Sequence, residues 1–163
     1  MIIWLFGLSG SGKTTIAKAL QKKLESESIG TACLDGDVIR EMFLPLGFSK
    51  EARRKNLLRA TLLAKTLNSS FQLIICSFIT PYNEIRNFIK KAGVKLVYVK
   101  CPLEECINRD PKGLYARAIT GEIKNFTGIS DPFEEPESVD LEVNTSLLSV
   151  DDCVDKIIER FKL

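Results

Sequence analysis

The stretch that decides the fold is Gly7-Leu8-Ser9-Gly10-Ser11-Gly12-Lys13-Thr14, which directly follows the apolar run Ile2 to Phe6. It satisfies the pattern G-x-x-x-x-G-K-[ST] between a predicted strand and a predicted helix, and so indicates a P-loop. Glycines let successive backbone N–H groups turn toward phosphate oxygens, and the following helix directs its positive end to the same place. The alternative is a Gly/Ser-rich turn that merely opens a helix. It does not explain why the glycine spacing, the Lys-Thr ending and the preceding apolar strand all agree with a P-loop.

In such a loop the lysine bridges the outer phosphates of ATP, and the threonine offers its hydroxyl to magnesium. We therefore expect ATP and Mg²⁺ as cofactors, with Lys13 and Thr14 in these roles. The predicted nucleotide-binding residues are Gly7, Ser9, Gly10, Ser11, Gly12, Lys13, Thr14 and Thr15.

The composition is that of an ordinary globular domain. At 163 residues, 45% of them hydrophobic and 27% charged, the chain fits a single P-loop domain over residues 1–163. A formal net charge of +2 gives no electrostatic reason to expect nucleic acid or a membrane as a partner. The first apolar run is too short for a signal peptide or a membrane span.

The cysteines and the lack of histidine limit the chemistry. The five cysteines are scattered without a C-x-x-C pair, and the chain has no histidine, so a common zinc site is not expected. Reduced, buried thiols and the absence of an export signal favour the cytoplasm. Every acid or base role must then fall to Asp, Glu, Lys, Cys or Tyr.

Apolar runs of strand length alternate with stretches of helical period, which predicts an α/β fold with a mostly parallel, five-stranded sheet and helices on both faces. The predicted strands are Ile2 to Phe6, Thr31 to Leu34, Gln72 to Phe78, Val94 to Lys100 and Leu141 to Asn144. The predicted helices are Lys13 to about Ser28, Ser49 to about Asn68, Pro81 to Ala92, a short one after Pro102, and Ser149 to Phe161.

The segment from Arg109 to Glu137 mixes glycine, proline, charges and aromatics without a sustained period. Loops of that length in a compact domain are usually functional or disordered. The aromatic residues in it favour a lid, about residues 109–137, that closes on a ligand.

Charged residues follow the second predicted strand, which ends in Leu34-Asp35-Gly36-Asp37 with Arg40 one turn later. In open α/β sheets ligands bind at the carboxyl ends of the strands. Asp35 and Asp37 can therefore hold hydrated magnesium and accept the proton of an attacking hydroxyl, and Arg40 can hold an anion of the acceptor. The structural alternative is that Asp37 caps a helix starting at Val38.

The third predicted strand ends in Cys76-Ser77-Phe78-Ile79-Thr80-Pro81, so Ser77, Phe78 and Thr80 are expected to face the same cleft. A Walker B motif has an aspartate at the end of such a strand, and this strand has none. The magnesium carboxylate is therefore expected from Asp35 or Asp37.

These residues resemble the adenylylsulfate kinase family, which transfers the ATP γ-phosphate to the ribose 3′-hydroxyl of adenylyl sulfate. The resemblance covers almost the whole chain and is most specific in the lid. It rests on the P-loop, the Asp35-Gly36-Asp37 strand end with Arg40, Leu46-Gly47-Phe48-Ser49 with Arg53 and Asn56, Ser77 to Pro81, Cys101 to Glu104, Arg109 to Tyr115, Gly121 to Ile129, and Glu135 to Glu137.

The resemblance implies a role for each matching residue. Phe48 and Phe126 would sandwich the base of the acceptor. Asp35 would lie beside the 3′-hydroxyl with Asp37 assisting, and Arg109 would reach over ATP. The implied catalytic residues are Asp35, Lys13 and Asp37, the metal ligands Thr14 and Asp35, and the acceptor-binding residues Asp37, Arg40, Phe48, Arg53, Asn56, Phe78, Ile79, Thr80, Lys124 and Phe126.

Four departures from the family pattern concern the acceptor. Val38 replaces a usual Asn, Glu41 to Pro45 is one residue short, Ile119-Thr120 replaces Arg-Ala, and Thr80 replaces a serine sometimes described as a phosphorylated intermediate. Direct transfer is expected, because an in-line displacement needs no covalent enzyme intermediate. The family default is adenylyl sulfate, and the alternative is the related cytidine diphosphoramidate kinase of capsule polysaccharide synthesis.

Two other function classes are weighed against a kinase. A non-catalytic ATP-binding regulator has no need of Asp35 or of Arg40 and Lys124 for an acceptor. A hydrolytic P-loop switch is disfavoured because no Asn-Lys-x-Asp run occurs and the lid would exclude water. The expected partner is a small nucleotide acceptor, and the resemblance adds a possible homodimer.

Overall fold

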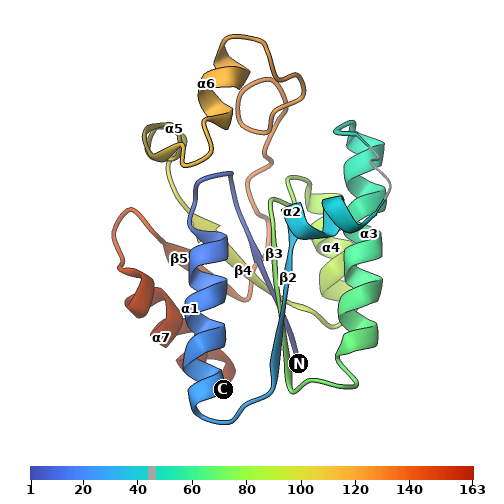
Figure 1. The fold of residues 1–163 in the computed structure, drawn as a ribbon, viewed down its shortest axis with the longest axis vertical. Helices are drawn as coiled ribbons and strands as arrows, with labels where there is room; N and C mark the ends of the chain where they lie inside the picture. Colours follow the sequence, from blue (N-terminus) through green and yellow to red (C-terminus); the bar gives the residue numbers. More distant parts are fainter. Residues whose placement is uncertain (44–46) are drawn as a thin grey trace.

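The sheet is fully parallel in the computed structural model, which describes residues 1–43 and 47–163. Within these residues the strand order is β2-β3-β1-β4-β5 (Figure 1). Every pairing is parallel, and each strand lies within one residue of its predicted range, so the predicted fold class is confirmed. The strands are β1 (Ile2–Phe6), β2 (Thr31–Asp35), β3 (Leu73–Phe78), β4 (Lys95–Lys100) and β5 (Leu141–Asn144).

The helices connect these strands. The described helices are α1 (Lys13–Ser26), α2 (Gly36–Met42), α3 (Lys50–Leu67), α4 (Asn83–Lys91), α5 (Leu103–Arg109), α6 (Leu114–Ile119) and α7 (Val150–Phe161). The ends of α1, α3, α4 and α7 agree with prediction within two residues. Helix α6 is a correction, because the sequence indicated no helix inside the lid segment, residues 109–137.

Local capping explains why α6 forms despite its short length. The carboxylate of Asp110 accepts the backbone N–H of Tyr115 and of Ala116, both at 3.1 Å. Gly113, which precedes the helix, has a φ of 64°, in the left-handed region that favours glycine. A helix of six residues is too short to show a period in the sequence.

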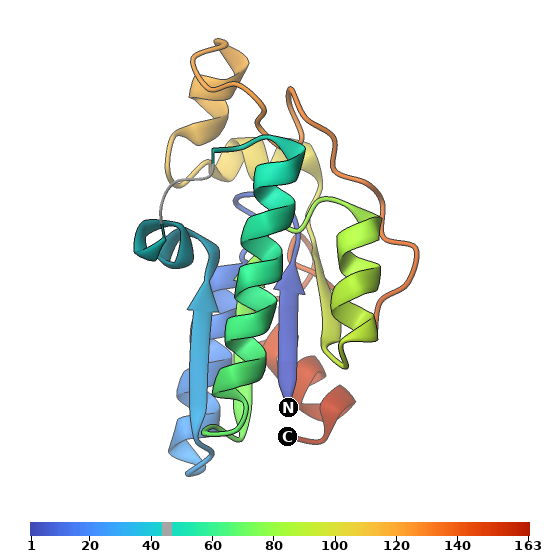
Figure 2. The same ribbon diagram turned by 90° about the vertical axis from the view of Figure 1, so that its right-hand side faces the viewer.

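The three inner strands β1, β3 and β4 are buried on both faces over most of their length, which accounts for their continuous apolar runs. Side chains alternate between two cores. Ile3 and Leu5 of β1 pack with α1 and α7, whereas Trp4 and Phe6 pack with α3 and α4. Figure 2 shows α3 in front of the sheet and α1 behind it.

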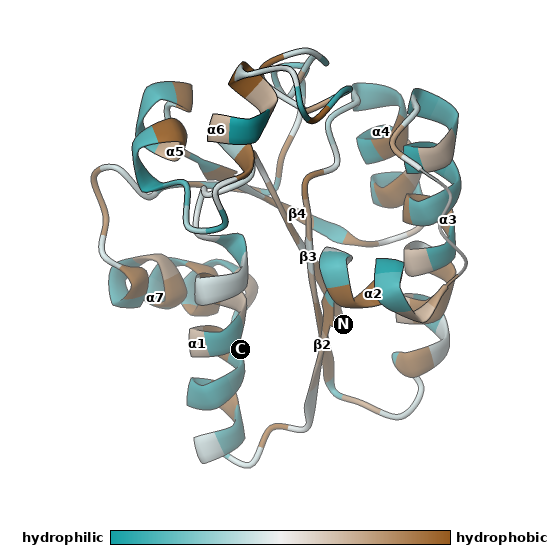
Figure 3. Ribbon diagram, turned by 45° about the horizontal axis from the view of Figure 1, so that its top comes forward, coloured by the Kyte–Doolittle hydropathy of each residue, from teal (hydrophilic) through white to brown (hydrophobic). Residues whose placement is uncertain are grey.

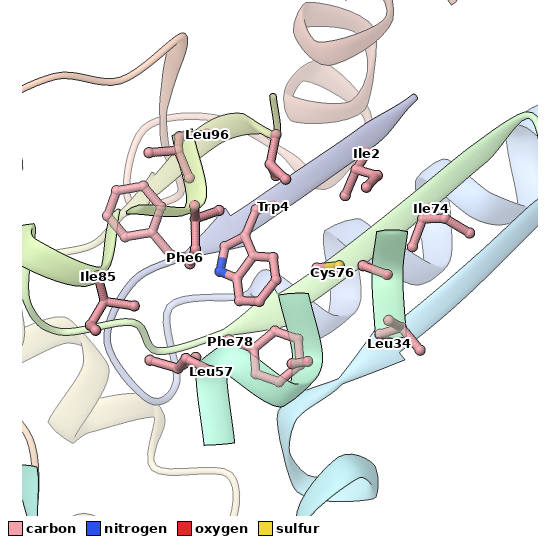
Figure 4. Close-up of a cluster of buried hydrophobic side chains, with 14 of the residues drawn as sticks. Ile2, Trp4, Phe6, Leu34, Leu57, Ile74, Cys76, Phe78, Ile85 and Leu96 are labelled. Carbon is pink, nitrogen blue, oxygen red and sulfur yellow. The ribbon is translucent and has the colours of Figure 1, made fainter. Parts of the chain in front are cut away.

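Trp4 lies in the core beneath α3, among the side chains drawn in Figure 4. Its ring stacks on Phe78 with 4.6 Å between centroids. Its indole N–H donates to the hydroxyl of Thr80 at 2.8 Å, so the buried polar atom is satisfied. The contact fixes the end of β3 against the central strand.

The ribbon in Figure 3 is coloured hydrophilic over much of the helices and mainly hydrophobic along the central strands. Among the described helices none is long and apolar enough to cross a membrane. The carboxyl ends of the strands point toward α5, α6 and the lid segment, which lie above them in Figure 1. This edge of the sheet carries the candidate site.

Leu20 tests the packing of α1 on the sheet, because its side chain is completely buried between the two. Leu20→Ala removes buried apolar volume and leaves a cavity, so we expect the free energy of unfolding to fall by about 2 to 5 kcal/mol. Urea denaturation followed by circular dichroism measures it. The matched variant Leu147→Ala, at a side chain that is 81% exposed, should change stability by less than about 0.5 kcal/mol.

Candidate active site

The P-loop, residues 7–14, folds tightly between β1 and α1. A Cβ atom added to Gly7 would lie 2.4 Å from the carbonyl oxygen of Val99 on β4, so a larger residue cannot occupy this position without movement of the sheet. Gly10 and Gly12 have φ angles of 74° and 95°. The first N–H groups of α1 have no partner inside the helix and carry the positive end of its dipole. The backbone thus forms a tight glycine-rich turn between β1 and α1 at the place that the sequence predicts.

Lys13 is buried beneath this turn. Its ammonium donates to the carbonyl oxygen of Leu8 at 2.5 Å and to the hydroxyl of Ser11 at 3.3 Å. Burial lowers the pKa of Lys13 to about 8, although the carboxylates of Asp35 and Asp37 act in the opposite direction. A charge held out of water in this way is placed to meet an anion.

Thr14 and Asp35 come together at the ends of α1 and β2. The hydroxyl of Thr14 donates to Oδ2 of Asp35 at 2.7 Å and lies 3.3 Å from the hydroxyl of Ser77. Thr15, the next residue of α1, is exposed to solvent. A hydroxyl and a carboxylate at hydrogen-bond distance are oxygen ligands of the kind that magnesium prefers.

Asp35 also caps α2, which corrects the helix start that the sequence suggested. Helix α2 begins at Gly36, and Oδ1 of Asp35 accepts the backbone N–H of Asp37 at 2.9 Å. Asp35, not Asp37, is therefore the capping residue. Its second oxygen remains on Thr14, so the structural role leaves the carboxylate at the site.

Asp37 is exposed on α2 and forms an ion pair with Lys112 of the lid segment. The hydrogen bond that Lys112 donates to Asp37 raises the pKa of Lys112, which stays charged at neutral pH. The sequence did not single out Lys112. An exposed lysine 75 residues away along the chain carries no signal of this contact.

The residues predicted to bind the acceptor lie on α2, on α3, in the segment between these helices, at the end of β3 and in the lid segment. The guanidinium of Arg40 lies 4.7 Å from the centroid of the Phe48 ring, which is 54% exposed. Lys124 is exposed, whereas Phe126 is half-buried and meets Tyr115 edge-on with 5.0 Å between ring centroids. Asn56 is buried on α3, one turn after Arg53.

Arg53 differs from Arg40 and Lys124 because it is buried and its guanidinium makes three hydrogen bonds within the protein. It is 5% exposed and donates to the carbonyl oxygen of Phe48, to the hydroxyl of Thr127 and to the carbonyl oxygen of Asn125. Arg53 thus contacts both the segment that carries Phe48 and the lid turn that carries Phe126.

The end of β3 is more buried than the sequence predicts. Phe78 is 4% exposed and packs on Trp4, and the Thr80 hydroxyl, 1% exposed, accepts the Trp4 indole N–H. Ile79 is half-buried, and its carbonyl oxygen accepts the N–H of Gly7 at 3.3 Å. Ser77 is the side chain of this turn that reaches Thr14.

Two further contacts join the lid segment and its preceding helix to the P-loop. The hydroxyl of Tyr115 donates to the carbonyl oxygen of Ser9 at 2.9 Å. Arg109 donates to the side chain and backbone of Thr145, whose hydroxyl donates to the carbonyl oxygen of Ser11 at 2.9 Å. Thr145 was not predicted, because it belongs to the turn after β5 and no motif marks it.

Apart from Thr80, which is 1% exposed, the departures from the family pattern are exposed where the structure describes them. Val38 on α2 is 52% exposed and Ile119 on α6 is 58% exposed. Thr120 ends α6, and its hydroxyl donates to the carbonyl oxygens of Ala116 and Arg117. Residues 44–46, which include part of the shortened stretch and Leu46 of the family motif, lie outside the described residues.

A phosphate-binding loop, a strand-end carboxylate and a covering segment occur in many kinases, so the assignment to a family requires comparison. The family model described as adenylylsulphate kinase matches residues 1–144. The chain belongs to the adenylylsulphate kinase family. Its helix α7 lies beyond the matched range.

Individual relatives agree with this adenylylsulphate kinase assignment. A probable adenylyl-sulfate kinase of Pseudomonas aeruginosa is 46% identical over 162 residues, which cover 98% of this chain and 76% of the relative. A probable adenylyl-sulfate kinase of Synechocystis is 47% identical over 161 residues, covering 97% and 91%. The comparisons do not support the alternative acceptor, cytidine diphosphoramidate, or a role in capsule synthesis.

Solved structures agree as well. The Mycobacterium tuberculosis APS kinase in complex with AMPPNP and APS has a TM-score of 0.93 and 36% identity, covering 99% of this chain and 97% of that chain. Shikimate kinase from Aquifex aeolicus has a TM-score of 0.58 at 20% identity, covering 99% and 96%, and shares the fold alone. The P-loop kinase fold is therefore shown by neighbours inside and outside the family.

The lowered pKa of Lys13 makes stability depend on pH. Its pKa is about 8 in the folded chain against 10.5 for an ordinary lysine, so the unfolded state holds the proton more tightly. Burying the charged lysine therefore lowers the free energy of unfolding at low pH. This destabilisation disappears as the pH rises and the lysine loses its proton. The free energy of unfolding of Lys13→Met minus that of the wild type should fall by about 3 kcal/mol, mostly between about pH 8 and 10. Denaturant titrations across this range measure it, and a constant difference would contradict the burial of the charge.

Proposed function

We propose that the chain transfers the γ-phosphate of ATP to the ribose 3′-hydroxyl of adenylyl sulfate, giving ADP and 3′-phosphoadenylyl sulfate. The observation that carries the proposal is the contact of Thr14 with Asp35 at 2.7 Å beside the buried ammonium of Lys13. Lys13 would bind phosphate, Thr14 and Asp35 would bind magnesium, and Asp35 would accept the proton of the attacking hydroxyl. Similarity to a kinase solved with AMPPNP and APS supports the choice of donor and acceptor.

On the donor side, the P-loop backbone and the start of α1 would hold the triphosphate, and Lys13 would contact its outer phosphates. Arg109 lies across the loop beside Thr145, where it would cover the nucleotide. The predicted pocket thus lies between the P-loop and the lid segment.

Thr14 and Asp35 would hold magnesium, which neutralises phosphate charge when it is bound. Both supply oxygen atoms, the ligand type that fits this ion. The described residues contain no cluster of three or more His, Cys, Asp or Glu side chains suited to a metal. That agrees with an ion that takes its remaining ligands from phosphate and water.

On the acceptor side, Phe48 and Phe126 would hold the base, and Arg40 with Lys124 would hold the anionic phosphosulfate. The ribose 3′-oxygen forms a bond to the γ-phosphorus as the bond from that phosphorus to the β,γ-bridging oxygen breaks. ADP leaves with the electron pair, and Asp35 takes the proton of the hydroxyl with Asp37 orienting the acceptor. The Thr80 hydroxyl is turned toward Trp4, which favours direct transfer without a phosphorylated residue.

A non-catalytic ATP-binding regulator is the second candidate. It would need the P-loop but not the paired acids at the end of β2. The lid segment of such a protein would have no reason to reach Asp37 through Lys112. The homodimer and the cytoplasmic location indicated by the sequence stay predictions.

Asp35→Asn is the direct test of the kinase proposal. The amide keeps the size of the side chain but cannot accept the hydroxyl proton, so we expect turnover to fall by about 10²–10⁴-fold while ATP still binds. ADP release with ATP, Mg²⁺ and adenylyl sulfate measures turnover, and calorimetry with AMPPNP measures binding. Asp155→Asn, at an exposed aspartate paired with Lys23, is the matched control. Unchanged turnover in Asp35→Asn would remove that residue from its role.

A further inference from the structure

The side chain of Arg86, on α4, is buried beside the end of the lid segment. It is 2% exposed, and its guanidinium lies between two phenyl rings, 4.7 Å from the centroid of Phe6 and 4.7 Å from that of Phe133. Burial lowers the pKa of Arg86 to about 10, so the group stays charged at neutral pH. A buried charge costs free energy unless it is hydrogen-bonded. The acceptors of its hydrogen bonds therefore show which segments it holds.

Every nitrogen of this guanidinium donates to an acceptor. Nε donates to the carbonyl oxygen of Thr80 at 2.9 Å, and Nη2 donates to that of Pro81 at 3.0 Å. Nη1 donates to the carbonyl oxygen of Glu134 at 2.7 Å and to the side chain of Asn83 at 2.8 Å. Arg86 thus joins the turn between β3 and α4 to the end of the lid segment.

Glu134 is bound to the same turn through its backbone and its side chain. Its N–H donates to the carbonyl oxygen of Pro81 at 2.9 Å, and its carbonyl oxygen accepts Arg86. Its carboxylate accepts the backbone N–H of Asn83 at 2.6 Å. Helix α4 begins at Asn83, and within the described residues its N-cap residue, Tyr82, makes no side-chain capping hydrogen bond. Glu134 therefore caps α4 from 51 residues further along the chain.

The residues on either side of Glu134 pack along the same surface. The ring of Phe133 stacks on Tyr98 of β4 with 6.0 Å between centroids. The side chain of Asn83 donates to the carbonyl oxygen of Glu135 at 2.9 Å. Figure 2 shows this part of the chain, in orange, running beside α4. Residues 133–137, here called the lid arm, thus lie against α4 and β4.

The earlier part of the lid segment, residues 110–130, contacts the candidate site instead. Tyr115 donates to the carbonyl oxygen of Ser9 in the P-loop, and Lys112 pairs with Asp37. Under the proposed function these contacts would change when a ligand binds, because Ser9 and Asp37 would contact it. The contacts of the lid arm reach residues outside the predicted ligand-binding set, so a bound ligand gives them no reason to change.

We propose that Arg86 and Glu134 are positioning residues, which fix the lid arm so that only residues 110–130 move when ligands bind. The lid predicted from the sequence, residues 109–137, therefore divides into a movable part and a fixed arm. A segment fixed at its carboxyl end has fewer open positions, so it closes at a smaller cost in conformational entropy. The inference rests on the proposed function, because the movable part carries Lys124, which is assigned to the acceptor.

Hydrogen exchange followed by mass spectrometry tests this division. When AMPPNP and Mg²⁺ are added to the wild type, exchange should slow in peptides from residues 110–130 and stay constant in those from residues 133–137. An equal response of both ranges, or none in either, overturns the proposal.

Arg86→Lys tests the part that the guanidinium plays in the same measurement. The ammonium keeps the charge but lacks the fork that holds Thr80, Pro81 and Glu134 together. Exchange of residues 133–137 in the free chain should therefore rise about tenfold, the factor for one lost hydrogen bond to a charged group. It should also become sensitive to AMPPNP. Exchange that matches the wild type in both respects removes Arg86 from its role.

Glu134 gives a kinetic test that leaves Arg86 in place. Glu134→Ala removes the acceptor for the N–H of Asn83, so the KM for adenylyl sulfate should rise by up to about tenfold. The affinity for AMPPNP, measured by calorimetry, should stay constant. Glu134→Gln keeps an oxygen acceptor and should restore the KM. The matched control is Glu84→Ala, at an exposed glutamate of the first turn of α4 that pairs with Arg54 at 3.5 Å, and it should behave as the wild type.

A merely structural role of Glu134 predicts a different outcome. Glu134→Ala would then lower the Tm but leave the KM for adenylyl sulfate constant at a temperature where circular dichroism shows the variant folded. That result overturns the positioning role.

Failure of the proposed function is distinguishable from failure of this inference. A wild-type chain that binds AMPPNP but does not phosphorylate adenylyl sulfate contradicts the proposed reaction. The fixed arm is then judged by hydrogen exchange alone, because that measurement uses no acceptor. A response confined to residues 110–130 supports the fixed arm, and a response shared by residues 133–137 overturns it.

Discussion

The in-register parallel pairing of β1, β2 and β3 is the constraint on which the site depends. Phe6 pairs with Phe78, and Asp35 pairs with Ser77. The P-loop therefore leaves β1 at the level where β2 presents its carboxylate and β3 its hydroxyl. A slip of one residue would exchange the two faces of a strand, and both faces are buried in different cores. Packing far from the site thus fixes where Asp35 meets Thr14.

The lid segment and the helix before it touch the core at separate parts of this site. Tyr115 and Arg109 reach the P-loop side, Lys112 reaches Asp37, and the turn around Thr127 reaches Arg53. These contacts span the donor side and the acceptor side. Under the proposed function, the position of this segment would be coupled to the binding of both ATP and the acceptor, because each ligand would replace or reinforce a different contact.

Features with a local origin could be predicted from the sequence. The P-loop motif, the buried strands and the long helices depend on neighbouring residues, and all are found at or near their expected positions. Helix α6 could not be predicted, because it depends on one capping aspartate and not on a period. The contacts of Arg53 could not be predicted either. Its partners in the lid lie 72 and 74 residues away, so the sequence marked it as an acceptor-binding residue without revealing its hydrogen bonds, and that role stays a prediction.

The ion pair between Lys112 and Asp37 has a consequence for the rate of turnover. Both side chains are more than half exposed, and exposed pairs contribute at most about 1 kcal/mol. Under the proposed function, such a contact would lengthen the lifetime of a closed lid segment by about fivefold at most. Added salt would weaken the ion pair and reduce this effect. Because product release limits turnover in many enzymes, an ion pair exposed to solvent would favour rapid exchange of ADP over long retention of ATP.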